Sequence, residues 1–220
     1  MNTFVLQCIL GIALMTVKGT KGCRKELFYE RLGRYPDSWR ILRETTNQFF
    51  LAFYSVSSKT GSDQMCLHTK SRTLDPMKPW MSTLTYGHTL DNTTLLSGTV
   101  NVGITKTNDT FVFDDAFNTT YKERVPVKDL RYEDKHDVSE IIYTNFNSCI
   151  VMRSQILGYQ VWVKGEYPTG ITSIPYLCTF LYEACSGRRK NWAYDWRICP
   201  QIRSKVIPNN GHTRKPRSIQ

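Results

Sequence analysis

Cysteine is the residue type whose number and spacing carry the clearest chemistry in this chain. Of seven cysteines, Cys8 lies in an apolar stretch near the start. The other six are Cys23, Cys66, Cys149, Cys178, Cys185 and Cys199. Their spacing matches no zinc motif, and the four histidines are scattered. In an exported chain this even set predicts disulfides, although the residues alone leave the pairing open.

No catalytic signature accompanies the cysteines. The chain contains no G-x-S-x-G elbow, no H-E-x-x-H motif and no P-loop. Asp114 and Asp115 are adjacent acids, but such a pair at the end of a strand is usually part of a turn. We therefore predict a protein that is not an enzyme and needs no cofactor or metal.

The start of the chain indicates export. Residues 4–17 form an apolar run that is too short to span a bilayer comfortably, and it is closed by small residues up to Gly19. We predict a signal peptide over residues 1–19, which would remove Cys8; the alternative is a buried N-terminal element. No later run suits a membrane helix, so we expect a soluble, secreted, extracellular protein.

The stretch from Cys149 to Cys199 predicts two strands followed by a helix. Residues 149–153 and 160–164 carry β-branched and aromatic residues at strand spacing. After Ile174 the apolar period changes to i, i+3, i+4 and i+7, at Leu177, Phe180, Leu181 and Ala184. Pro175 suits the first helical position. A cysteine-bearing helix after a strand pair suggests a helix attached to the outside of a barrel.

The remainder of the mature chain is dominated by short candidate strands. We place them at residues 47–56, 65–69, 81–86, 97–104, 110–114, 123–127 and 141–146. A short helical plug is predicted from Pro36 to Leu42. Frequent turn signals between short strands favour either a closed antiparallel barrel or a sandwich. Residues 20–200 are expected to form one domain.

Three glycosylation sequons follow one another in the middle of the chain. They begin at Asn92, Asn108 and Asn118. Three sequons in one exported segment favour surface loops that carry glycans. The expected glycoprotein would carry them at turns between strands.

The formal net charge is +10, and much of the excess lies at the C-terminal end. Residues 201–220 contain several lysines and arginines and no acid, together with Pro208 and Pro216. We predict a basic, disordered tail. It would either remain solvated or attach weakly to sulfated, anionic glycans by charge attraction. Nucleic acid is not an expected partner, because no recognition motif is present.

The stretch from Cys149 onward resembles the C-terminal half of the tick salivary lipocalins, the family that includes the histamine-binding proteins. The matching features are Cys149, Gln160-Val161-Trp162, Ile174-Pro175-Tyr176-Leu177-Cys178, and Tyr194-Asp195 before Cys199. The resemblance covers about Pro36 to Cys199. It selects an all-β fold with terminal helices, an eight-stranded antiparallel lipocalin barrel with the C-terminal helix packed outside.

The resemblance also implies a set of disulfides and a function. The family's pairing would join Cys66 to Cys199 and Cys149 to Cys178, which leaves Cys23 with Cys185. The implied function is sequestration of a host inflammatory mediator during blood feeding, by a monomer that helps the tick evade host defence. About eight strands leave room for one small ligand inside the barrel.

The residues at the family's ligand positions decide which mediator we expect. Amine-binding members carry acids where this chain has Ile150 and Gln160, while Trp162 matches the aromatic member of the motif. Asp37 and Trp39 match the D-x-W of the N-terminal helix. Because a buried amine needs an opposite charge, the two missing acids favour an apolar lipid mediator, such as a leukotriene.

Two other functions stay open. The first is binding of a biogenic amine such as histamine or serotonin, with Asp37 as the remaining acid. The second is binding of a host protein through the barrel loops, which an interior filled by bulky side chains would support. Trp162 could equally pack structurally, Ile150 suits a core position, and Gln160 would face solvent if the strand register were shifted by one residue.

Overall fold

The computed structural model describes residues 23–44, 48–55, 65–75, 77–89, 95–109, 111–124, 132–165 and 174–201. The predicted signal peptide, residues 1–19, and the predicted tail beyond Gln201 lie outside these residues. The sequon at Asn92 lies outside them as well.

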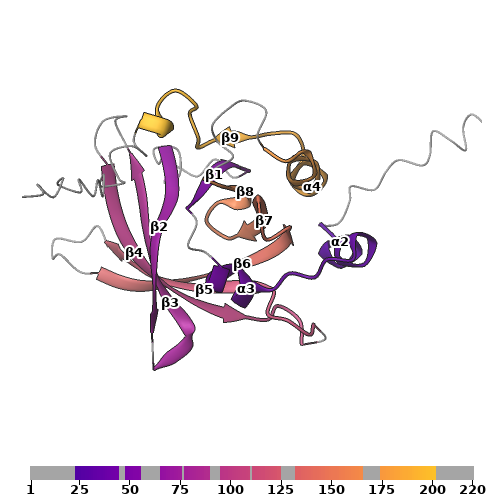
Figure 1. Cartoon of the computed structure of the whole chain (residues 1–220), viewed down its shortest axis with the longest axis horizontal. Coiled ribbons are helices and arrows are strands. Elements are labelled where there is room, and N and C mark those ends of the chain that lie inside the picture. Colours follow the sequence, from indigo (N-terminus) through magenta and orange to yellow (C-terminus); the bar gives the residue numbers. More distant parts are fainter. Residues whose placement is uncertain are drawn as a thin grey trace, which may run out of the picture.

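Eight antiparallel strands form a closed barrel (Figure 1). They are β1 (Phe49–Tyr54), β2 (Met65–Asp75), β3 (Lys78–Thr89), β4 (Leu95–Thr105), β5 (Ala116–Arg124), β6 (Tyr132–Thr144), β7 (Cys149–Ser154) and β8 (Gly158–Lys164). Neighbours from β2 to β8 pair in chain order, and β1 closes the barrel by pairing with both β8 and β2. The predicted eight-stranded antiparallel barrel is confirmed.

A ninth strand, β9 (Asn191–Trp192), completes the wall between β1 and β2. Phe50 of β1 lies opposite His68 of β2, whereas the end of β1 pairs with β9. The carbonyl of Ala52 accepts hydrogen bonds from the N–H groups of Ala193 and Tyr194, at 3.0 and 3.3 Å. The segment that follows the C-terminal helix is therefore part of the barrel wall, which the sequence pattern did not predict.

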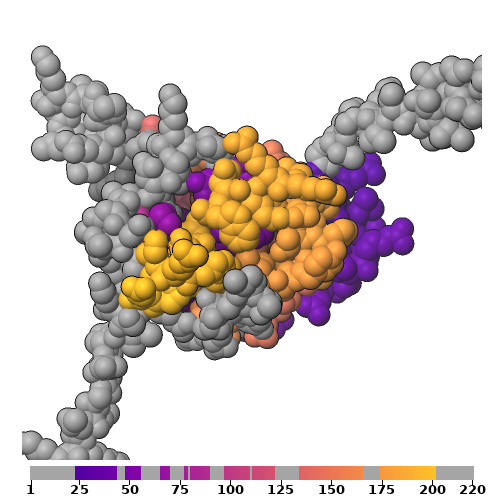
Figure 2. Space-filling view, turned by 90° about the horizontal axis from the view of Figure 1, so that it is seen from above, coloured from indigo at the N-terminus to yellow at the C-terminus, as the bar shows by residue number. Residues whose placement is uncertain are grey.

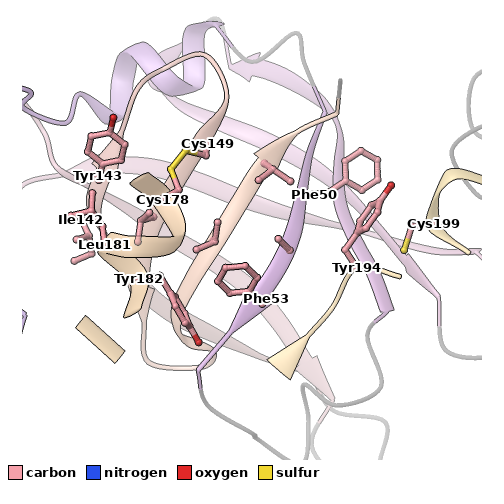
Figure 3. Close-up of a cluster of buried hydrophobic side chains, with 14 of the residues drawn as sticks. Phe50, Phe53, Ile142, Tyr143, Cys149, Cys178, Leu181, Tyr182, Tyr194 and Cys199 are labelled. Carbon is pink, nitrogen blue, oxygen red and sulfur yellow. A yellow bond between two sulfur atoms is a disulfide. The ribbon is translucent and has the colours of Figure 1, made fainter. Parts of the chain in front are cut away.

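The C-terminal helix α4 (Tyr176–Ser186) packs on the outside of the barrel. Figure 2 shows α4 and the segment after it side by side on one face of the molecule. Cys178, Leu181 and Tyr182 are buried against strand residues such as Phe53 and Ile142 (Figure 3). The predicted helix is confirmed, with Pro175 preceding it as its N-cap residue.

The predicted apolar stripe of α4 was only partly correct. Leu181 is buried, but Phe180 is 50% exposed and Ala184 is exposed. The helix instead turns the line of Cys178, Leu181 and Tyr182 inward. The disulfide from Cys178 to Cys149 of β7 is consistent with this rotation, because it requires Cys178 to face the barrel.

Two helices near the N-terminal end lie at the end of the barrel where β1 begins, which we call the base. The helix α3 (Ser38–Glu44) confirms the predicted plug and inserts Ile41 and Leu42 among inward-facing strand residues. The helix α2 (Lys25–Leu32) was not predicted. The Lys25 ammonium pairs with the Asp115 carboxylate at 2.7 Å, and both residues are buried. This ion pair fixes α2 to the residue that precedes β5.

Several predicted boundaries were wrong in the middle of the chain. Residues 111–115 form no strand, and β5 begins at Ala116. The strand predicted to begin at Ile141 begins nine residues earlier, at Tyr132. Asn118 consequently lies within β5, exposed on its outer face, whereas Asn108 lies in the exposed β4–β5 connection. The inward positions of β6 before Ile141 are themselves polar, at Lys135, Asp137 and Ser139, so no apolar alternation marks this strand.

The three disulfides of the structure are those that the family resemblance implied. They join Cys66 to Cys199, Cys149 to Cys178 and Cys23 to Cys185. The first fixes the segment after β9 to β2, the second fixes α4 to β7, and the third fixes the start of α2 to the end of α4. All three therefore connect the terminal segments to one side of the barrel.

Candidate ligand site inside the barrel

The inward-facing side chains form two clusters along the barrel. The base cluster contains Ile41, Leu42, Phe49, Val102, Phe117, Ile141, Ile150 and Met152. The mouth cluster contains Leu51, Tyr54, Leu67 and Ala193, with Tyr86, Leu157 and Trp162 packed against it. Trp162 also contacts the base cluster. The base is apolar and closed by α3, so a ligand would enter at the opposite end, the mouth, where the β7–β8 turn lies.

The register of β8 turns both Gln160 and Trp162 into the barrel. Trp162 lies opposite Ile150 of β7 and Leu51 of β1, which belong to the two interior clusters. Gln160 lies opposite Met152 and Tyr54 and is only 3% exposed. The possibility that Gln160 faces solvent is therefore excluded. Ile150 packs in the base cluster, in agreement with a core role.

Gln160 is held by a short polar network within the apolar interior. The indole Nε1–H of Trp162 donates to Oε1 of Gln160 at 2.9 Å, and Nε2 of Gln160 donates to Oγ of Ser154 at 2.8 Å. The N–H of Leu157 also donates to Oγ of Ser154, at 3.2 Å. Both ends of the buried amide are thus satisfied without a charge, as burial of a polar group requires. The network also fixes the orientation of the Trp162 ring.

Asp37 and Trp39 lie at the base end. Oδ1 of Asp37 accepts a hydrogen bond from the N–H of Arg40 at 2.8 Å, which is the interaction of a helix N-cap. Trp39 follows in α3 and is half-buried, outside the two interior clusters. The structure therefore brings Ile150, Gln160 and Trp162 together, whereas Asp37 stabilises the start of α3.

Asp137 is a buried acid that the sequence prediction missed. Along β6, Asp134, His136 and Val138 are exposed, whereas Asp137 is 7% exposed and faces the same side as Ile141. Its Oδ1 accepts a hydrogen bond from the N–H of Gln155 at 3.1 Å, in the β7–β8 turn. Asp137 therefore lies at the mouth end. The sequence signal is weak here, because the inward residues Lys135, Asp137 and Ser139 are all polar and no apolar alternation precedes Ile141.

The inner faces of β3 and β4 remain partly open to water. Leu84 and Tyr86 are half-buried although they pack against the interior clusters, and so is Val100 opposite Leu84. The Tyr86 ring lies over Gly98 of β4, where a Cβ atom would be 2.5 Å from Oη of Tyr86. These three inward side chains therefore keep some contact with water.

His88 extends this lining toward the mouth. It lies on the same face of β3 as Tyr86, and the two rings are stacked with centroids 6.1 Å apart. Burial lowers the pKa of His88 below its usual range, because desolvation penalises the imidazolium form. Its Nδ1 is enclosed and has no hydrogen-bond partner among the described residues. His88 is therefore neutral near pH 7 and adds no positive charge to the interior.

No metal site or membrane helix is present in the part of the chain that the structure describes. Its His, Cys, Asp and Glu side chains form no group of three that could hold a metal ion. None of its helices is long and apolar enough to cross a bilayer.

Residues 29–201, which include strands β1 to β9 with α3 and α4, match the family model of the tick histamine-binding protein. The chain belongs to the tick histamine-binding protein family. No curated protein matches it. A crystal structure of AM182 in complex with serotonin aligns at 14% identity with a TM-score of 0.46, covering 73% of this chain and 90% of the other. A selenomethionine derivative of a biogenic amine-binding protein aligns at 12% identity with a TM-score of 0.37, covering 74% and 90%.

Proposed function

We propose that the protein is a secreted binding protein that sequesters a small protonated amine, such as histamine or serotonin, inside the barrel. The observation that carries this proposal is the buried carboxylate of Asp137, which faces the interior at the mouth end. Membership of the tick histamine-binding protein family supports the same ligand class. The sequence favoured a lipid mediator, because Ile150 and Gln160 stand where amine-binding members carry acids. A biogenic amine, the alternative ligand, fits these observations better.

A carboxylate is required because an ammonium group loses its hydration when it enters the barrel. Oδ1 of Asp137 accepts one backbone hydrogen bond, and Oδ2 accepts none from a described residue. Oδ2 can therefore accept a hydrogen bond from a ligand ammonium group without breaking a contact of the protein. Lys135, on the same face of β6, has a partner of its own.

Aromatic rings in the lining suit the same ligand. Trp162 and Tyr86 are both half-buried and face the interior from β8 and β3. The faces of aromatic rings attract a nearby cation, and they also stack on the imidazole or indole ring of a biogenic amine. Gln160 fixes the Trp162 ring by the 2.9 Å hydrogen bond to its indole nitrogen. The proposed roles are thus counter-charge for Asp137 and ring contact for Trp162 and Tyr86.

The experiment that tests this proposal is a calorimetric titration of the full-length protein with histamine, serotonin and a leukotriene. Asp137→Asn should weaken amine binding by about tenfold or more, because it removes a charge-assisted hydrogen bond. The amide oxygen can still accept from Gln155, so the fold should be kept. Asp134→Asn is the matched control, because Asp134 is exposed on the outer face of the same strand.

Two results would contradict the proposal. The first is saturable binding of the leukotriene without any binding of the amines. The second is equal amine affinity in the Asp137→Asn and Asp134→Asn variants, since the acid inside the barrel would then contribute nothing beyond the acid outside it.

Gln160→Glu gives a complementary gain-of-function test. A carboxylate at this position would accept hydrogen bonds from Trp162 and Ser154, which already contact the amide. We expect amine affinity to rise by about tenfold, because a second negative charge would face the interior. The same titrations measure this change. An unchanged or lower affinity would show that the ligand does not reach the Gln160 end of the lining.

A further inference from the structure

The outer side of α4 and the segment after it form an exposed aromatic surface. Tyr176 is 82% exposed, Phe180 is 50% exposed, and Trp192 of β9 is 55% exposed. Both segments lie on the face of the molecule that Figure 2 displays. We call the outer side of residues 176–201 the α4–β9 face.

The exposure of these rings follows from the rotation of α4. The inner line of the helix is occupied by Cys178, Leu181 and Tyr182, which cover the barrel wall. Tyr176 and Phe180, one turn apart, consequently point to solvent. Their rings stack with centroids 6.2 Å apart and an interplanar angle of 23°. The helix thus carries a second apolar side that the barrel does not cover.

Unpaired positive charge accompanies the aromatic rings. Arg188, Arg189 and Arg197 are exposed, and none of them makes an ion pair with a described residue. The same face carries two acids, and only Glu183 has its charge paired within the described residues. Glu183 pairs with Lys190, and Oδ1 of Asp195 accepts the N–H of Arg197 at 2.7 Å. The α4–β9 face therefore presents arginine side chains that are free to bind an external anion.

The sequence beyond the described residues adds to this charge. The chain continues from Gln201, at the end of the α4–β9 face, with Arg203, Lys205, Arg214, Lys215 and Arg217 and with no acid. The formal net charge of +10 argues against a second copy of the chain as the partner, because two such molecules repel each other. The charges instead fit a polyanion.

We propose that the α4–β9 face binds a sulfated polysaccharide, at a site separate from the barrel interior. Arginine guanidinium groups match the oxygen atoms of sulfate and carboxylate groups in a bidentate manner, and exposed aromatic rings provide flat apolar contact for sugar rings. An anionic lipid surface fits less well. Three disulfides indicate an oxidising, extracellular setting, whereas anionic lipids are concentrated in the cytoplasmic leaflet.

The test is the affinity of the full-length protein for a defined heparin oligosaccharide, with desulfated heparin and phosphatidylserine vesicles in parallel. The triple variant Arg188→Ala, Arg189→Ala and Arg197→Ala should weaken heparin binding about tenfold, since each exposed ion pair contributes modestly. The matched control is Arg31→Ala, Arg34→Ala and Arg43→Ala. It removes three exposed arginines in α2, just after it and in α3, and should change affinity by less than about twofold.

The aromatic contribution is tested by the double variant Tyr176→Ser and Phe180→Ser. It should weaken heparin binding without changing the net charge, and the thermal unfolding midpoint reports whether the fold is kept. Equal losses in the two arginine variants would overturn the proposal, because net charge alone would then explain the binding. Equal affinity for desulfated heparin, or binding to the vesicles without binding to heparin, would overturn it as well.

Discussion

The barrel has two walls that differ in how they are covered. The covered wall consists of β1, β7 and β8, and its outer side lies under α4 and the segment after it. The open wall consists of β3, β4, β5 and the first part of β6, whose outer residues include exposed Asn101, Asn118 and Val138. Strands of the covered wall are buried on both faces, whereas those of the open wall alternate. The covered wall is therefore the scaffold of the fold, whereas the open wall supplies the part of the interior lining that water reaches.

The sequences of the two walls reflect this difference. β1 reads F-F-L-A-F-Y, and all six residues are buried. Continuous apolar runs of this kind occur where both sides of a strand are covered. β6 instead begins with alternating exposed and inward residues, among them Asp137. The proposed ligand site uses Trp162 and Gln160 from the covered wall and Asp137 and Tyr86 from the open wall.

The largest loss in the free energy of unfolding is expected from Phe53→Ala in the covered wall. Phe53 has no exposed surface and packs edge-to-face on Tyr182 of α4, with ring centroids 4.8 Å apart. The free energy of unfolding should fall by about 3–5 kcal/mol. Val138→Ala in the open wall should cost less than about 0.5 kcal/mol, because Val138 is 41% exposed. Urea unfolding measures both, and similar losses would show that α4 does not make the covered wall more stable.

The next largest effect is expected from the double variant Cys149→Ser and Cys178→Ser. This disulfide closes a loop of 29 residues, so its removal should lower the free energy of unfolding by roughly 3 kcal/mol. The loss should be concentrated in α4, whose amide hydrogens should exchange faster than those of β4. If α4 kept its protection while exchange increased throughout the barrel, the disulfide would not be what holds the helix on the covered wall.

A smaller effect is expected from Gly98→Ala in the open wall. The new Cβ would be 2.5 Å from Oη of Tyr86, so the ring must move, at a cost of roughly 1–3 kcal/mol. Amine affinity should fall at the same time if Tyr86 lines the ligand site. Gly103→Ala on the outer face of the same strand is the control, because its Cβ would meet its nearest atom at 3.7 Å. Equal amine affinity in the two variants would remove Tyr86 from the proposed site.

The elements that local sequence determines were predicted well. β1 is apolar throughout, β7 and β8 are mainly apolar, and α4 begins one residue after the predicted Pro175. The helix α2 was missed because half of its eight residues are charged, and its position depends on Lys25 reaching Asp115. β9 was missed because two residues carry too little pattern, and its position depends on the carbonyl of Ala52. Asp137 was missed because the first part of the strand that carries it is mostly polar on both faces.

The sequence by itself determined the all-β class and the C-terminal helix and, through family resemblance, the barrel and the pairing of the cysteines. The strands and the helix depend on residue type and short-range spacing. Only the tertiary structure decided that Gln160 and Trp162 share a hydrogen bond inside the barrel, that Asp137 faces the interior and that Tyr176 and Phe180 face solvent. The direction of a side chain depends on strand register and helix rotation, and both are set by contacts between residues far apart in the chain.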